Sequence, residues 1–197
     1  NYEEVKKRLS IRLNNKKRLL TTRPDSVYAP YLDFAVTCHI DVSYMAGTVA
    51  TCMVDRELME HIGVGQERLF KDAKENSVRT RPAVTMPIEE YMDDMGVMIM
   101  GGEQQLMIAK TEAQMHGAGV ILYPGFLEQI SGGRDLFLIP SSVHEWLYIE
   151  DRGAFTAEEL TEVLRTANRE VLKEEDVLSD DLYYYDGMIG EMRRVDR

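Results

Sequence analysis

The chain has 197 residues, of which 44% are hydrophobic and 29% are charged, a composition typical of a globular protein with a substantial core. It contains no apolar run near the ~18 residues of a membrane-spanning helix, so we expect no transmembrane segment. The net charge of -11 repels phosphate backbones, which argues against nucleic acid as a partner.

Residues 1–23 differ in charge from the rest of the chain. They hold eight Lys or Arg and two Glu, a charge of +6, so that the remainder carries -17. Apolar residues recur there at helical spacing, at Val5, Leu9, Leu13 and Leu20. This stripe predicts one basic amphipathic helix over Tyr2–Leu20 that packs on the acidic body, forms a solvated face or attaches to nucleic acid. The first ten residues are neither a signal peptide nor a natural start, so we interpret the helix as the remnant of a longer N-terminal region.

The next segments predict a hairpin followed by helices. Asp33–Tyr44 and Thr48–Val54 are rich in Val, Ile, Thr and Tyr and flank a short turn. Cys38 and Cys52 fall on these strands, where we expect reduced, buried thiols because no secretion signal is present. Further along, the predicted elements are a helix from an Asp55 cap to Gly63, a helix over Gln66–Asn76, an extended segment over Val78–Pro87, a short helix over Ile88–Met95, and a hairpin of Val97–Met100 with Gln105–Lys110.

The C-terminal half alternates strand and helix signals. The predicted elements are a strand over Ala118–Tyr123, a helix from Pro124 to Gly132, strands over Asp135–Ile139 and Val143–Glu150, a helix from a Thr156 and Glu159 capping box to about Lys173, and a hairpin of Leu182–Tyr185 with Ile189–Arg193. Hairpins with helices placed between them favour an α+β fold, with a mostly antiparallel sheet and helices packed on it. Because no linker is visible, we expect a single domain over residues 1–197.

Ser141, Ser142 and His144 are the candidate catalytic residues, with Glu145 beside them. Nucleophilic catalysis needs a serine oxygen within reach of a histidine nitrogen, and a third group that orients the imidazole. On a strand, His144 and Glu145 would point to opposite faces, and neither serine lies in a G-x-S-x-G elbow. The pattern therefore favours a turn between two strands. A hydrolase is the alternative, with a distant carboxylate such as Asp135 or Asp181.

Metal and cofactor motifs are missing from the sequence. No Cys and His spacing matches a zinc site, and the acidic residues near Asp180 lack the EF-hand pattern. The glycines form neither GxGxxG nor GxxxxGK[ST]. We therefore expect no metal and no cofactor.

A binding surface is predicted where the Pro-Ser-Ser turn lies near aromatic residues. Successive rings of the tyrosine run point to opposite faces of a strand, so at least one ring should face outward. The expected surface for a protein or small-molecule partner comprises Tyr123, Pro140, Ser141, His144, Tyr183, Tyr184 and Tyr185.

Six segments of the chain together resemble a known family. They are YEEVKKRLSIRLNNKKRLL, YLDFAVTCHI, HIGVGQERLFKDAKENS, GAGVILYPGFLEQI, LFLIPSSVHEWLYI and VLSDDLYYYDG, in this order. The family consists of uncharacterised proteins from Gram-positive gut bacteria that share a domain of unknown function. The resemblance implies a cytoplasmic protein with an additional N-terminal segment, and it assigns no catalytic residue, substrate or cofactor. We therefore predict a non-catalytic cytoplasmic interaction or ligand-binding module.

Overall fold

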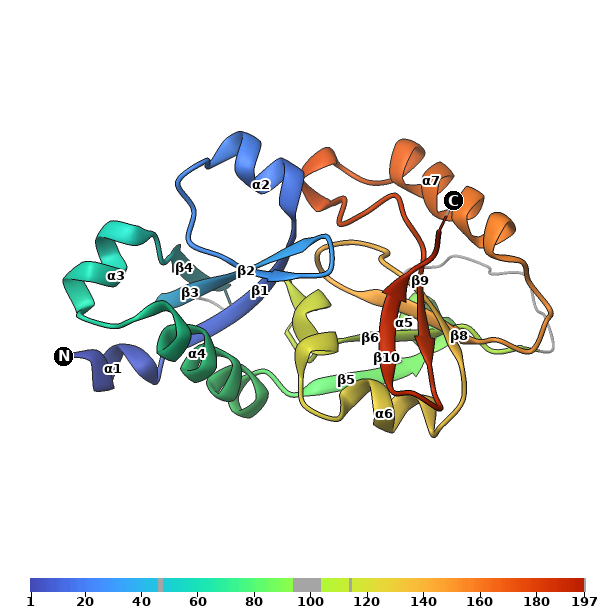
Figure 1. Ribbon diagram of the computed structural model, residues 1–197, viewed down its shortest axis with the longest axis horizontal. Helices are drawn as coiled ribbons and strands as arrows, with labels where there is room; N and C mark the ends of the chain where they lie inside the picture. The colour runs from blue at the N-terminus through green and yellow to red at the C-terminus, as the bar shows by residue number, and fades with distance from the viewer. Residues whose placement is uncertain (46–47, 94–103, 114, 197) are drawn as a thin grey trace. The chain divides into compact units, whose positions relative to one another are not determined.

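The computed structural model describes residues 1–45, 48–93, 104–113 and 115–196 (Figure 1). The chain divides into two compact units, unit 1 at Asn1–Pro82 and unit 2 at Ala83–Arg197. Each unit combines helices with its own antiparallel sheet, so the predicted α+β class is confirmed. A single domain would require the two units to unfold together, and this expectation stays a prediction.

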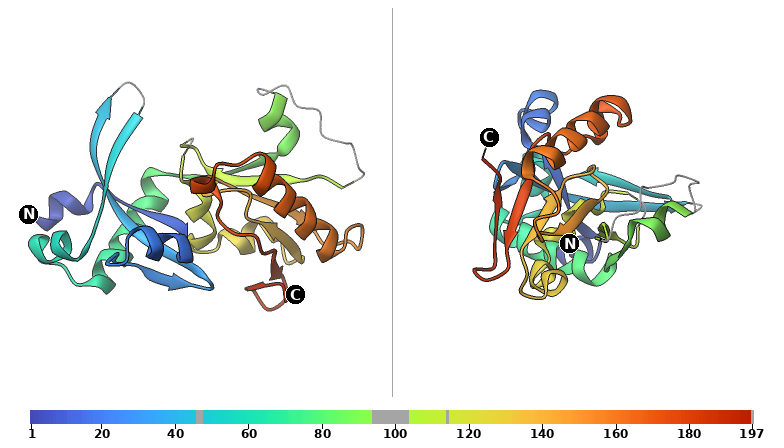
Figure 2. Two further views of the ribbon diagram at one scale, coloured as in Figure 1. Left: turned by 90° about the horizontal axis from the view of Figure 1, so that it is seen from above. Right: turned by 90° about the vertical axis from the view of Figure 1, so that its right-hand side faces the viewer.

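Unit 1 is built around a four-stranded antiparallel sheet, sheet A, in which the long strand β3 is central. Strand β1 pairs along one side of β3, and β2 and β4 pair one after the other along the opposite side. The strands are β1 (Leu9–Asn15), β2 (Ala29–Tyr31), β3 (Phe34–Met45) and β4 (Thr48–Met53). The helices are α1 (Tyr2–Lys6), α2 (Lys16–Thr22), α3 (Arg56–Ile62) and α4 (Gln66–Thr80). The β3–β4 hairpin is as predicted, and its far end extends beyond β1 and β2 (Figure 2).

The prediction of one helix over Tyr2–Leu20, and with it the basic N-terminal helix of residues 1–23, is wrong. The segment forms α1, β1 and α2 in succession. Leu9, Ile11 and Leu13 alternate along β1, and all three are buried. Leu9 and Leu13, which the sequence predicted to lie on a helical stripe, are thus two of the alternating inward residues of a strand. Strand β3 stabilises β1 by supplying backbone hydrogen-bond partners.

Helix α4 holds the outer edge of β1 through two polar side chains. The Ser77 hydroxyl accepts a hydrogen bond from the Ile11 amide at 2.9 Å. Asn76 Nδ2 donates to the carbonyl oxygens of Lys7 at 3.0 Å and Leu9 at 2.8 Å. These bonds satisfy backbone groups of an edge strand that would otherwise need water or another chain.

The remaining predictions in unit 1 are partly confirmed. Asp55 caps α3 and accepts from the Leu58 amide, and Gly63 ends the helix in the left-handed conformation. Helix α4 continues to Thr80, so the segment predicted to be extended from Val78 begins as helix. Both cysteines are free, but Cys38 is buried whereas Cys52 is exposed. The expectation of two buried thiols therefore holds only for Cys38.

Unit 2 contains a six-stranded antiparallel sheet, sheet B, with the order β10-β9-β7-β8-β6-β5. The strands are β5 (Ala83–Pro87), β6 (Met107–Thr111), β7 (Leu136–Ile139), β8 (Trp146–Glu150), β9 (Tyr183–Asp186) and β10 (Glu191–Arg194). The helices are α5 (Ile88–Asp93), η1 (Gly117–Leu122), α6 (Phe126–Ser131), α7 (Ala157–Glu170) and η2 (Glu174–Asp176), where η marks a 3-10 helix.

The two faces of sheet B are covered by different helices. On one face Phe137 and Ile149 pack with Leu160 and Leu164 of α7. On the other face the Trp146 indole donates to the carbonyl of Ala118 in η1 at 2.9 Å. Alternation along β7 and β8 places Leu136, Tyr148 and Glu150 on this second face, where they reach the surface beside α6.

Several local predictions in unit 2 are confirmed. The Thr156 and Glu159 capping box is present at the start of α7, with the Thr156 amide 2.8 Å from a Glu159 carboxylate oxygen. The last hairpin forms from β9 and β10. Helix α6 ends at Gly132 as expected, although it begins at Phe126. No helix in the described part of the chain is long and apolar enough to cross a membrane.

Other local predictions in unit 2 are wrong or fall outside the described residues. The predicted strand over Ala118–Tyr123 is the 3-10 helix η1, whose start is pressed against the 141–145 turn: a Cβ on Gly117 would lie 2.5 Å from the His144 carbonyl oxygen. The strand predicted from Val143 begins at Trp146, because the preceding residues form a hydrogen-bonded turn. The predicted strand over residues 97–100 lies outside the described residues, and β6 pairs instead with β5 and β8.

Candidate functional site

The serine hydroxyls of the 141–145 turn face a carboxylate. Ser142 Oγ donates to Glu145 Oε1 at 2.9 Å and accepts a hydrogen bond from the His144 amide at 3.0 Å. Ser141 Oγ lies 3.2 Å from the same Glu145 oxygen. The sequence predicted that His144 and Glu145 would point to opposite faces of a strand, whereas the segment is a turn in which Glu145 bonds to the two serines.

Both imidazole nitrogens of His144 are engaged outside the serine pair. Nδ1 accepts a hydrogen bond from the His116 amide at 2.9 Å, so the ring proton lies on Nε2 in the neutral form. Nε2 is 3.1 Å from Asp176 Oδ1, to which it donates. A general base for serine needs an unoccupied nitrogen directed at the hydroxyl. The geometry therefore does not favour the hydrolase alternative, and the cluster joins the turn to η1 and η2.

Most of the aromatic residues expected at a binding surface lie in the core. Tyr183 packs edge-on against Trp146 with ring centroids 5.6 Å apart. Tyr184 is half-buried, and its hydroxyl donates to Asp151 at 3.1 Å. Burial, and then this bond, raise the pKa of the Tyr184 phenol. The buried members of the predicted surface are Tyr123, Pro140, Tyr183 and Tyr185. Partial exposure remains at Ser141, His144 and Tyr184 only.

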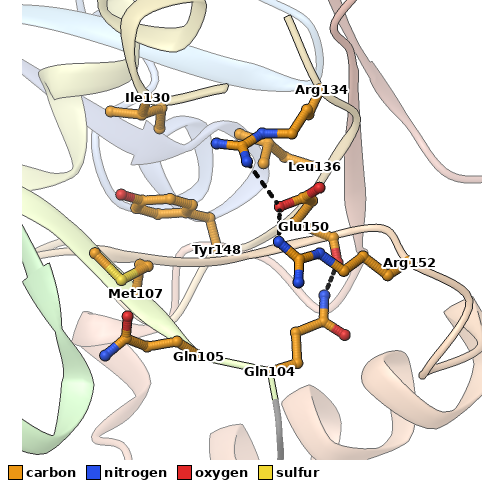
Figure 3. Close-up of a pocket in the computed structure, with 9 residues that line it drawn as sticks. All are labelled: Gln104, Gln105, Met107, Ile130, Arg134, Leu136, Tyr148, Glu150 and Arg152. Carbon is orange, nitrogen blue, oxygen red and sulfur yellow. Dashed lines mark hydrogen bonds and ion pairs between the residues drawn. The ribbon is translucent and has the colours of Figure 1, made fainter. Parts of the chain in front are cut away.

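A cavity of about 320 Å³ lies on the second face of sheet B (Figure 3). It is lined by Gln104, Gln105, Met107, Ile130, Arg134, Leu136, Tyr148, Glu150 and Arg152. These residues come from β6 and the segment before it, from the end of α6 and β7, and from β8 and the residues after it. We call this the Glu150 cavity.

The rim of the Glu150 cavity is charged. Glu150 Oε2 lies 2.8 Å from Arg152 Nη2 and 3.4 Å from Arg134 Nη1. The hydrogen bond from Arg152, helped by Arg134, lowers the pKa of the Glu150 carboxyl, and the same bond raises the pKa of Arg152. The side chains of Arg134 and Arg152 are each 58% exposed, whereas the Glu150 side chain is 22% exposed. The rim thus carries one excess positive charge that is open to solvent.

Apolar and aromatic side chains lie below the charged rim of the Glu150 cavity. Leu136 is 3% exposed and Tyr148 is 6% exposed, and Met107 and Ile130 lie beside them. The Tyr148 hydroxyl is hydrogen-bonded to Thr85 Oγ1, which fixes the ring. Burial raises the pKa of this phenol, so it is neutral at physiological pH. An apolar floor below a few converging charged groups is the usual form of a small-molecule site.

Almost no signal in the amino-acid sequence pointed to the Glu150 cavity. Its residues span positions 104–152 and match no motif. Tyr148, Glu150 and Arg152 follow one another at every second position of the sequence, a spacing that predicts one side of a strand. Nothing in the sequence, however, indicated that Arg134 would meet them.

Two other features of the described residues bear on the choice of site. A second cavity of about 330 Å³ near the start of α7 is lined by acidic side chains, including Glu158, Glu162 and Asp181, and by the apolar side chains of Ala157, Leu182 and Val195. Within the described residues, no group of three or more His, Cys, Asp and Glu is placed to hold a metal ion. The excess charge of the second cavity is negative, like that of the chain as a whole, so it does not distinguish this cavity from the rest of the molecule.

Comparison with known proteins finds one family. The model of a family of unknown function, DUF5688, matches residues 1–187. No curated protein and no solved structure matches the chain.

Proposed function

The chain belongs to DUF5688, a family of unknown function, and we propose from the geometry of unit 2 that it is a non-catalytic module that binds a small ligand in the Glu150 cavity. The observation that carries this proposal is the cavity itself, in which Arg134 and Arg152 converge on Glu150 above an apolar floor. The engagement of both His144 ring nitrogens supports a role without serine chemistry.

We further propose that the protein acts in the cytoplasm of a bacterium. The two cysteines are free and lie on neighbouring strands, which suits a reducing compartment. The charge of -11 argues against nucleic acid as the partner, since phosphate backbones are repelled.

A thermal-shift screen tests the proposed function. Ligands that bind only the folded protein raise its melting temperature, so purified protein is screened against common metabolites, nucleotides and metal salts. We expect hits that Ile130→Trp removes, because the larger side chain fills the cavity. Val163→Trp is the matched control, since Val163 is 66% exposed on α7 and outside the cavity lining.

A His144→Ala variant separates the cavity from the serine-histidine turn. The proposal expects the hits to persist in this variant, because His144 does not line the cavity. Hits that survive Ile130→Trp and disappear in His144→Ala would contradict the proposal and move the site to the turn.

A further inference from the structure

The structure points to the class of ligand that the Glu150 cavity takes. We infer that it binds a molecule with a single carboxylate beside a small apolar group, and that Arg134 and Arg152 bind the carboxylate. The inference rests on the proposed function and adds the chemistry of recognition to it.

The local charge favours an anion. The cavity lining holds two guanidinium groups and one carboxylate, whereas the chain as a whole carries -11. An anionic ligand is therefore repelled by most of the molecule and attracted at this rim. A cationic ligand would have to approach two guanidinium groups to reach Glu150.

The two arginines keep donors for a ligand. In the described part of the chain, Arg152 uses only Nη2, toward Glu150. Arg134 uses Nη1 toward Glu150 and Nε toward the Ser131 carbonyl at 3.2 Å. Each guanidinium carries five N–H donors in a planar fork, which suits a second carboxylate.

Glu150 positions this pair of arginines. Figure 3 shows the guanidinium groups meeting Glu150 from two sides, with Tyr148 and Met107 lying to one side of them. A ligand carboxylate beside Glu150 would meet both cations at once, and its apolar part would lie over Tyr148 and Met107. The carboxylate of Glu150 is thus a positioning group that also competes with the ligand.

The size of the cavity limits the ligand. Ligand pockets usually span roughly 300–1,000 Å³, and about 320 Å³ lies at the lower end. This volume suits a carboxylate with an apolar group near the size of a leucine side chain. A single excess positive charge also balances one carboxylate better than it balances a chain of phosphates.

Calorimetric titration with N-acetyl-L-leucine tests the inference. N-acetyl-L-leucinamide is the matched probe, because it has nearly the same shape and no charge. We expect the acid to bind and the amide to bind about tenfold more weakly or not at all, since charged hydrogen bonds are lost. A peptide that ends in leucine, with a free or an amidated carboxyl terminus, shows whether the carboxylate comes from a small molecule or from a chain end.

Four variants locate the binding. Arg134→Gln and Arg152→Gln should each weaken the binding of N-acetyl-L-leucine about five- to tenfold. The loss is moderate because both side chains are half exposed and their charges are screened by water. Arg169→Gln on α7, where the side chain is 62% exposed, should change nothing. Glu150→Gln should leave the affinity unchanged or improve it, because the amide oxygen still accepts from Arg152 and holds it in place, while the competing negative charge is removed.

Three results would overturn the inference. Equal binding of the acid and the amide, or loss of binding in Glu150→Gln, would exclude recognition of a carboxylate. In that case removal of hits by Ile130→Trp would still support ligand binding in the cavity. Failure of N-acetyl-L-leucine to bind at millimolar concentration would reject this ligand class, and a flat thermal-shift screen as well would reject the proposed function itself.

Discussion

The Ser142 side chain is buried and hydrogen-bonded on both sides, to Glu145 and to the His144 amide. Its role is therefore to stabilise the turn that joins β7 to β8. Ser141 donates to the same carboxylate over a longer distance and is partly exposed. The two neighbouring serines thus form a natural pair for comparison.

Ser142→Ala should lower the free energy of unfolding by about 1–2 kcal/mol, because it leaves the His144 amide without its acceptor. Ser141→Ala should cost less than half as much, since no other described group depends on its hydroxyl. Urea unfolding followed by circular dichroism measures both changes. Equal losses in the two variants would show that the burial of Ser142 and its bond from the His144 amide do not add to the stability of the turn.

Ionisation of the Tyr184 phenol at alkaline pH lowers the stability of the folded protein. Burial and the bond to Asp151 raise the pKa of the phenol in the folded state above its ordinary value of about 10. The contribution of the neutral phenol is therefore complete below pH ~10 and is lost as the pH rises toward the folded-state value.

Tyr184→Phe should thus be less stable than the wild type at pH 8, and the difference should shrink as the pH rises above about 10. Other tyrosines with raised pKa values are present in both proteins, so their effects cancel. The measurement is a series of urea midpoints between pH 8 and pH 11. A difference that stays constant over this range would contradict the role given to the Asp151 bond.

Strand β1 depends on helix α4 as well as on β3. Ile11 donates its amide to Ser77, which is fully buried, and this bond replaces a missing neighbour strand. The stabilisation of the edge is therefore a property of two elements together.

Ser77→Ala should destabilise the protein by about 1–3 kcal/mol, because the buried Ile11 amide loses the Ser77 hydroxyl as its acceptor. Thr80→Ala, one turn further along α4, should be nearly neutral, since the Thr80 hydroxyl bonds to the Asn76 carbonyl within the same helix. Denaturant unfolding of both variants gives the comparison. A neutral Ser77→Ala would show that water satisfies the Ile11 amide equally well.

Elements with complete local signals were predicted, and elements with ambiguous signals were not. The start of α7 was found because Thr156 and Glu159 bond to each other, and the last hairpin because the turn at Asp186 lies within a few residues of both strands. Strand β1 was missed because Leu9 and Leu13 fit a helix and a strand equally. Only pairing with β3 distinguishes these two periods.

The two units raise the question of cooperativity for the whole molecule. Leu69 is fully buried in unit 1, and Trp146, the single tryptophan of the chain, is fully buried in unit 2. A substitution in one unit can therefore be followed by fluorescence from the other.

Under the single-domain prediction, Leu69→Ala should lower the unfolding midpoint reported by Trp146 fluorescence, with a cost of about 2–5 kcal/mol. Val78→Ala is the control, because Val78 lies on the same helix and is 41% exposed. A Trp146 transition that does not move, while circular dichroism shows an earlier transition, would instead assign two independent domains.

The sequence by itself determined the class of fold, the β3–β4 and β9–β10 hairpins and the capped starts of α3 and α7, because these follow from composition and from residues within a few positions of one another. Tertiary structure alone decided that residues 9–15 form a strand, that four of the expected surface residues are buried, and that Arg134 meets Arg152 at Glu150. The physical reason is distance along the chain. A strand needs a partner strand, and a cavity needs walls from several segments, so neither can be predicted from a single short segment of the sequence.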